Sequence, residues 1–185
     1  KGVSGTMEPV AVTSCFAPAV ADYISRYKLS QGTEVAVSGT IGFSEEKFND
    51  LKIVFRDVDG TGIYSLWGDD YAIRSPQGEV IYRNKDLYYD IKGALFGRAL
   101  SVKGKVNLRP GANNYTVSLK AGSFPYKVIG AKLPFEDLVV GVAAADQSVA
   151  FDVGARVFGG KVTLTGEMKT DAEPNPFKGE IRLNG

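Results

Sequence analysis

The sequence predicts an almost all-β fold with one amphipathic helix near the N-terminus. Apolar residues alternate with polar ones from residue 33 onward, turn-forming residues separate the alternating stretches, and a strand-rich segment recurs later in the chain. A period of two is typical of antiparallel strands with one apolar face and one solvent-exposed polar face. The 185 residues fit one domain, or a few repeated units that share a continuous core.

A helix is predicted over residues 15–28, where apolar residues recur at helical spacing and polar residues occupy the other face. Thr13 or Ser14 could cap its N-terminus. We expect this helix to cover one end of the sheet, with a membrane-surface or partner-docking role as the alternative. Residues 1–32 then form an N-terminal segment, and residues 33–185 form the β region.

The β region contains an internal repeat. When Asp90 is placed over Asp152, an offset of 152 − 90 = 62, glycines and aromatic residues coincide further along. The matched pairs are Phe96 with Phe158, Gly97 with Gly159, Gly104 with Gly166, Tyr115 with Phe177 and Leu119 with Ile181. Each unit is expected to contain a strand, a Phe-Gly turn, a strand with a central glycine, a polar turn and a strand. The central glycine permits a bend in the sheet.

The repeat divides the β region into three units and an insert. The units cover residues 88–121 and 150–183, with a weaker copy at residues 35–56. Residues 60–86, which include Trp67, follow the pattern poorly and are interpreted as a decorated insert.

The composition excludes several kinds of site. The chain has no histidine, so it contains no histidine-dependent triad, no histidine metal ligand and no imidazole acid–base group. Cys15 is the single cysteine, which excludes an internal disulfide and a multi-cysteine metal site. With 22 Lys and Arg against 21 Asp and Glu, the net charge of +1 gives no general attraction for nucleic acid. We expect no cofactor, no metal, no nucleic-acid partner and no catalysis.

The longest apolar stretch is too short to be a membrane-spanning helix. It runs from Leu138 to Ala145, whereas such a helix needs roughly 18 apolar residues, so we predict a buried strand. No signal peptide or initiating methionine is recognisable, and residues 181–185 stop in mid-pattern. We therefore expect the chain to be part of a longer protein, whose targeting signals lie elsewhere.

The repeat unit resembles that of AsmA-like proteins, the group that includes TamB and related envelope proteins. The stretch from Ala155 to Gly166, a polar turn and then Phe177 to Leu183 follow that unit, as do residues 88–121. The resemblance extends over residues 15–185. It implies a curved, groove-like sheet, or an open barrel or sandwich, whose concave apolar face carries lipid acyl chains.

The resemblance also implies a location and partners. Members are anchored in the inner membrane by an N-terminal helix and extend through the periplasm, so the implied anchor and flanking repeats lie outside this chain. The implied cargo is a phospholipid or another acyl lipid, and the implied role is lipid transport or outer-membrane assembly. Candidate groove residues alternate along the repeated strands: Val102, Val106, Leu108, Val117, Leu119, Val162, Leu164 and Ile181. The alternative for these residues is a closed core that holds no ligand.

The stretch Asp57-Val-Asp59-Gly60 resembles the start of a calcium loop. An EF-hand loop needs glutamate at its twelfth position, which is Gly68 here, so a tight hairpin with Asp-Gly at its tip is predicted instead.

Asp69 and Asp70 suggest two rival functions. The first is a secreted carbohydrate-binding or adhesive β-sandwich, which would place Trp67, Tyr64 and Tyr71 on one exposed face. The second is a glycoside hydrolase fragment, which requires two carboxylates facing each other across a cleft. Adjacent strand residues point to opposite faces, so a solvated loop is the preferred interpretation of Asp69 and Asp70.

Overall fold

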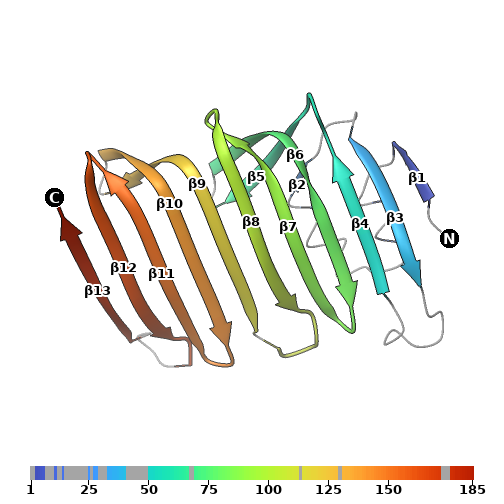
Figure 1. The fold of residues 1–185 in the computed structure, drawn as a ribbon. Coiled ribbons are helices and arrows are strands. Elements are labelled where there is room, and N and C mark those ends of the chain that lie inside the picture. The colour runs from blue at the N-terminus through green and yellow to red at the C-terminus, as the bar shows by residue number, and fades with distance from the viewer. Residues whose placement is uncertain are drawn as a thin grey trace.

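The computed structural model shows one open antiparallel β-sheet, with β1 and β13 at its two ends (Figure 1). Eleven strands follow one another along a continuous path, and β2 and β5 branch from it at β6. The structure describes residues 3–6, 11, 14, 25, 27–28, 33–40, 50–66, 69–112, 114–128, 131–171 and 176–185. The predicted antiparallel, mostly β fold is confirmed. Within the described residues the strands form a single sheet, not the two layers of a sandwich.

The longest strands are β6, β9 and β10, with 15, 14 and 15 residues. The bounds of the strands are β1 Val3–Thr6, β2 Tyr27–Lys28, β3 Glu34–Thr40, β4 Asp50–Arg56, β5 Thr61–Leu66, β6 Asp69–Arg83, β7 Asp86–Leu95, β8 Arg98–Asn107, β9 Tyr115–Val128, β10 Ala131–Ala145, β11 Ser148–Val157, β12 Gly160–Lys169 and β13 Phe177–Asn184.

The predicted helix over residues 15–28 lies largely outside the described residues, and its last two residues are not helical. Tyr27 and Lys28 form strand β2, which pairs with β5, so backbone pairing overrides the local helical pattern at this end. Further upstream, Ala11 and Ser14 have helical backbone, and the Ser14 hydroxyl donates a hydrogen bond to the Ala11 carbonyl at 2.8 Å. Ser14 itself has helical backbone, which differs from the non-helical backbone of an N-cap residue.

Strand order departs from chain order at β5. β4 pairs with the second half of β6, from Arg56↔Gln77 to Asp50↔Arg83, while β5 pairs with the first half of β6. Since β7 occupies the other edge of β6, β4 and β5 follow one another along a single edge. Because β4 and β5 do not pair, the hairpin predicted at Asp57–Gly60 does not form.

Asp57 stabilises this break between β4 and β5. The side chain is buried, and its carboxylate accepts a hydrogen bond from the Thr33 hydroxyl at 3.0 Å. The Asp57 backbone amide donates a hydrogen bond to the Pro76 carbonyl at 2.9 Å, so the segment between β4 and β5 is bonded to the middle of β6. The carboxylate therefore has a structural role in joining three segments.

Two four-strand modules of the sheet have matching backbones. The first module, β6 to β9, and the second module, β10 to β13, have strands whose first residues differ by 62 positions: Asp69 and Ala131, Asp86 and Ser148, Arg98 and Gly160, Tyr115 and Phe177. The turn residues Phe96 and Phe158 have φ values of 51° and 50°. The correspondence thus begins at residue 69, inside the stretch that the sequence pattern set apart as an insert.

The modules also share a β-bulge. Ser75 in β6 and Asp137 in β10 have φ values of 48° and 51° and lie 137 − 75 = 62 positions apart. The pairing register shifts between Arg74 and Gln77 in the first module, and between Glu136 and Val139 in the second. A bulge changes the local twist of a strand and re-aims its side chains. The same irregularity is therefore built into both modules.

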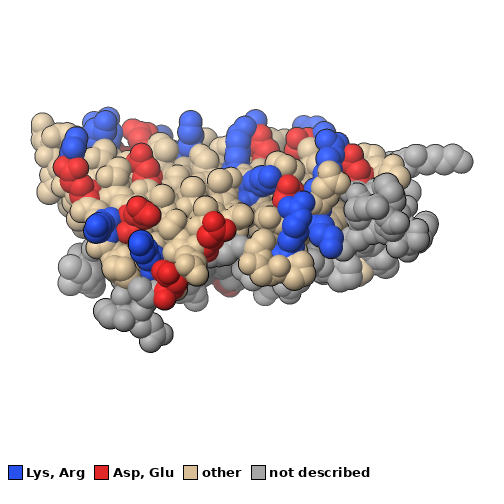
Figure 2. Space-filling view, turned by 90° about the horizontal axis from the view of Figure 1, so that it is seen from below, with Lys and Arg blue, Asp and Glu red and all other residues tan. Residues whose placement is uncertain are grey.

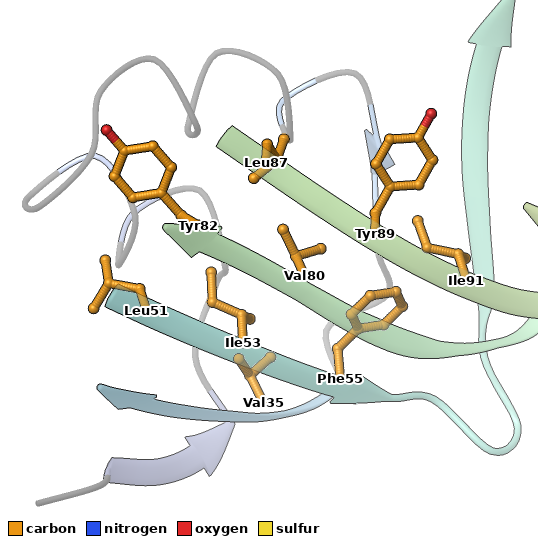
Figure 3. Packing of buried hydrophobic residues seen from close by; sticks show 9 residues of the cluster. All are labelled: Val35, Leu51, Ile53, Phe55, Val80, Tyr82, Leu87, Tyr89 and Ile91. Carbon is orange, nitrogen blue, oxygen red and sulfur yellow. The ribbon is translucent and has the colours of Figure 1, made fainter. Parts of the chain in front are cut away.

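The densest packing lies on one face of β3, β4, β6 and β7. Figure 3 shows this cluster, in which side chains from neighbouring strands interdigitate above the sheet. Leu87, the most buried member, is 0% exposed. The members are Val35, Leu51, Ile53, Phe55, Val80, Tyr82, Leu87, Tyr89 and Ile91.

Candidate functional site

One face of the sheet is apolar across the ten strands of the main path from β3 to β13, and we call it the apolar face. Residues that pair directly across neighbouring strands point to the same face. One such row crosses ten strands, from β3 to β13 in sheet order: Val35, Phe55, Gly78, Ile91, Val102, Leu119, Val140, Val153, Leu164 and Ile181. Parallel rows on either side are apolar in the same way.

The eight predicted groove residues belong to this apolar face or pack against it. Four of them lie in the row just given, while Val106, Val117 and Val162 lie in parallel rows. Leu108 follows the end of β8 and packs against the buried cluster of Figure 3. The sequence pattern thus identified one continuous surface, and the structure adds that it extends over the remaining strands as well.

Burial of the apolar face decreases from the first module to the C-terminal edge. Val102, Val106 and Leu108 pack against the buried cluster, and Val117, Leu119, Val162 and Leu164 are half-buried. Ile181 on β13 is 66% exposed. The apolar face is therefore a closed core at one end and an accessible surface at the other.

Aromatic rings on this face lie over glycines at equivalent positions of the two modules. A Cβ atom at Gly104 would collide with the ring of Tyr89, its cross-strand partner. In the second module, a Cβ at Gly166 would lie 2.6 Å from the ring of Phe151. Phe151 also stacks on Phe177, with ring centroids 5.5 Å apart. These two rings form a stacked aromatic pair across β11 to β13, which the sequence analysis did not single out.

The tyrosines of the rival carbohydrate site pack within the molecule. Tyr64 and Tyr71 are half-buried against a second apolar cluster. The Tyr71 ring stacks on Phe124 at 5.3 Å and meets Phe96 edge-on at 6.5 Å. Trp67 lies outside the described residues. Tyr64 and Tyr71 therefore do not form the exposed aromatic face that a carbohydrate-binding surface requires.

The acidic stretches at Asp57–Asp59 and Asp69–Asp70 form no metal cluster among the described residues. Asp69 and Asp70 are the first residues of β6, paired with β5, rather than part of the predicted loop. The Asp70 side chain is exposed. Within the described part of the chain, no group of three or more Asp, Glu or Cys side chains could hold a metal ion.

The opposite face is polar, and charged side chains gather along it on the upper side of the view in Figure 2. In the first module, Lys103 forms an ion pair with Asp90 at 2.7 Å, and Lys105 forms one with Asp86 at 3.0 Å. The hydrogen bond to Asp86, followed by one with Tyr88, raises the pKa of Lys105 above its ordinary value. These pairs are partly exposed, so they contribute little to stability.

Two open hollows lie over the polar face. The first, about 660 Å³, is lined by Gln77, Lys92 and Ser101 among others. The second, about 810 Å³, is lined in part by the residues 62 positions later. Val139 corresponds to Gln77, and Gly154 corresponds to Lys92. Their recurrence shows that the repeated backbone creates them, and neither includes a predicted groove residue.

Among the described residues, no helix is long and apolar enough to cross a membrane. Comparison of the chain with protein-family models, curated proteins and solved structures found no match.

Proposed function

We propose that this chain is a non-catalytic domain of the bacterial envelope that shelters lipid acyl chains along its apolar face. In this proposal the sheet curves so that the apolar face becomes the concave side of a groove. Flanking repeats of the same protein extend the groove, and regions outside this chain attach it to the inner membrane. The domain then acts in phospholipid transport or outer-membrane assembly.

The observation that carries the proposal is the exposure of large apolar side chains at the end of a continuous apolar row. On β13, Phe177, Ile181 and Leu183 are 55%, 66% and 73% exposed. Exposed apolar surface of this extent is typical of interaction sites. The row from Val102 on β8 to Ile181 crosses five strand spacings, about 24 Å, which provides a long surface for an extended chain.

The energetics favour a flexible apolar ligand. Each methylene that leaves water for an apolar surface contributes roughly 0.8 kcal/mol, so an acyl chain gains affinity along its whole length. No directional contact is needed, which agrees with the lack of polar side chains along the row. The headgroup remains in water while the chain lies against the sheet.

The test compares two neighbouring residues of β12 that point to opposite faces. Leu164→Glu places a carboxylate on the apolar face, whereas Thr165→Glu places the same group on the polar face. Each purified variant is incubated with phosphatidylethanolamine–phosphatidylglycerol vesicles that carry a fluorescent phospholipid, then separated from them, and the bound lipid is measured. We expect Leu164→Glu to lower lipid retention about tenfold, because desolvating a charge is costly.

The Thr165→Glu variant should retain lipid within about twofold of the unmodified chain, since its substitution is solvated. Equal retention by the two variants, or no lipid retained by the unmodified chain, would contradict the proposal. Circular dichroism of both variants verifies that the sheet remains folded. A glycan array with the unmodified chain tests the rival carbohydrate function, for which we expect no binding.

A further inference from the structure

We propose that one end of the sheet docks on the surface of a lipid bilayer that contains anionic phospholipid. This end carries exposed apolar side chains in its turns, and we call it the docking end. They are Val58 after β4, Phe96 between β7 and β8, and Phe158 between β11 and β12. The proposal goes beyond acyl-chain binding, because it concerns the turns at the end of the sheet rather than its apolar face.

The two ends of the sheet differ in the polarity of their turns. Val58, Phe96 and Phe158 are 56%, 54% and 81% exposed, and their turns lie at the upper end of the sheet in Figure 1. At the opposite end, the turns after β6 and β10 begin with Asn84 and Asp146. Among the described residues, no turn at that end exposes a large apolar side chain. Single exposed apolar residues are ordinary, but their grouping at one end indicates an interaction surface.

The two phenylalanines occupy a backbone conformation that does not suit them. Phe96 and Phe158 have φ values of 51° and 50°, a region that is unfavourable for bulky residues and more accessible to asparagine and aspartate. Asn84 and Asp146, with φ values of 53° and 52°, meet the same requirement at the opposite end. The turn therefore does not need an aromatic residue, and strain of this kind is typical of functional positions.

The exposure of Phe96 arises within the sheet, where strands are present on both sides. The hairpin of β7 and β8 lies between β6 and β9. Tyr71 of β6 and Phe124 of β9 meet the Phe96 ring edge-on, with centroids 6.5 and 6.4 Å away. More than half of Phe96 remains exposed beside these neighbours. The turn at Val58 is also held in place, because the Ser75 hydroxyl donates a hydrogen bond to the Val58 carbonyl at 2.6 Å.

The spacing of the three side chains favours a bilayer over a protein partner. Neighbouring strands are 4.7–4.9 Å apart, so Phe96 and Phe158 are separated by roughly 19 Å, and Val58 and Phe96 by roughly 12 Å. The residues that dominate a protein interface cluster near its centre. A bilayer surface, in contrast, accepts each separated side chain independently.

Basic side chains next to the phenylalanines suit anionic headgroups. Arg98 follows Phe96 by two positions, and Lys161 follows Phe158 by three. Both cations are exposed, and neither forms an ion pair among the described residues. Basic residues close to a membrane surface are attracted by anionic lipids, and aromatic residues beside them lie at the boundary between headgroups and acyl chains.

The experiment measures flotation of the full chain with vesicles of phosphatidylethanolamine and phosphatidylglycerol. The double variant Phe96→Asn with Phe158→Asn removes both rings and supplies a residue that suits the turn, so the sheet remains folded. We expect it to bind these vesicles about tenfold or more weakly, because two apolar side chains no longer leave water. Phe96→Trp with Phe158→Trp should bind at least as tightly as the unmodified chain.

A pair of valines provides the matched control. Val58→Asn should weaken vesicle binding about threefold. Val54→Asn makes the same change within β4, on the polar face and away from the docking end, and should leave binding unchanged. Vesicles of phosphatidylcholine alone should bind the unmodified chain about threefold more weakly, since they offer Arg98 and Lys161 no net negative charge.

Hydrogen exchange of the unmodified chain tests the docking end without any substitution. Vesicles should slow exchange at residues 95–98 and leave residues 84–86 unchanged. Three outcomes would overturn the proposal: no vesicle binding by the unmodified chain, equal binding by the double asparagine variant, or protection at residues 84–86 instead of 95–98. Leu164→Glu should bind vesicles like the unmodified chain, so failure of docking and failure of acyl-chain sheltering are distinguishable.

Discussion

The first and second modules have matching strands, turns and bulges, yet their apolar faces are buried to different extents. Leu87 of β7 is fully buried, whereas its counterpart 62 positions later, Val149 of β11, is half-buried. Tyr82 of the first module corresponds to Ala144 of the second. The first module also carries cross-strand ion pairs at Asp86 and Asp90. Backbone geometry is thus repeated, while side-chain size and packing divide the sheet into a core and an open surface.

This comparison teaches that a repeated sheet can assign different roles to equivalent strands. Large side chains in the first module fill a cluster together with β3 and β4, which stabilises the fold. Smaller side chains in the second module leave the apolar face accessible, which is a requirement for binding on that face. The most tightly buried part of the apolar face and its most exposed part therefore lie at opposite ends of the sheet.

The largest expected effect tests this division directly. Leu87→Ala removes a fully buried side chain and should lower the free energy of unfolding by about 2–5 kcal/mol. Val149→Ala, at the equivalent position, should cost about 1 kcal/mol or less, because the valine is already half-exposed. Urea denaturation of both variants measures the difference. Equal costs would show that the two modules contribute alike to the core.

A smaller effect is expected at the equivalent glycines. At Gly104, an added methyl group collides with the Thr116 carbonyl oxygen and the Tyr89 ring, so Gly104→Ala should cost about 1–3 kcal/mol. At Gly166, the Phe151 ring tip lies 2.6 Å from an added Cβ and the Lys178 carbonyl oxygen 2.9 Å from it, so the backbone contact is looser than at Gly104. Gly166→Ala should therefore lower the free energy of unfolding by less than Gly104→Ala, about 1 kcal/mol.

Thermal unfolding measures both variants, and Gly154→Ala is the control. The structure shows no atom within 4 Å of a Cβ added at Gly154, so its substitution should change stability by less than about 0.5 kcal/mol. If Gly166→Ala lowered the free energy of unfolding more than Gly104→Ala, the result would contradict the greater accessibility of the second module.

The smallest effect concerns the cross-strand ion pairs of the first module. The hydrogen bond to Asp86 raises the pKa of Lys105, so the folded state holds this proton more tightly than the unfolded state. The resulting stabilisation is fully present at neutral pH and is lost as the pH rises through the raised pKa. NMR titration of Lys105 in Asp86→Asn should show a lower pKa than in the unmodified chain, and an unchanged pKa would refute this.

Much of the candidate site could be predicted from the sequence, because alternation is a local property. Val102, Leu119 and Leu164 were identified by a period of two, and the register places them in one row. The stacked pair of Phe151 and Phe177 was not identified, although both residues follow the same alternation. Stacking depends on the glycine between them, whose effect appears only when β11, β12 and β13 lie side by side.

The repeat was only partly visible in the sequence for a related reason. Glycine and aromatic identities at Gly104, Gly166 and the Phe-Gly turns marked the later strands of each module. β6 and β10 have equivalent bounds and the same bulge, yet Val80 and Val142 are their only identical pair at equivalent positions, because many side chains fit a strand of given polarity. Sequence matching therefore missed the strand that begins each module.

The sequence by itself determined the antiparallel strands, the positions of the Phe-Gly turns and the polarity of the two faces, because these follow from local backbone preferences and residue spacing. Only the tertiary structure decided that β4 and β5 share one edge of β6, that Asp57 is buried between them, and that the apolar face is closed at Leu87 and open at Ile181. Which strands pair with each other, and which side chains become buried, depends on contacts between distant segments, and no local sequence pattern encodes those contacts.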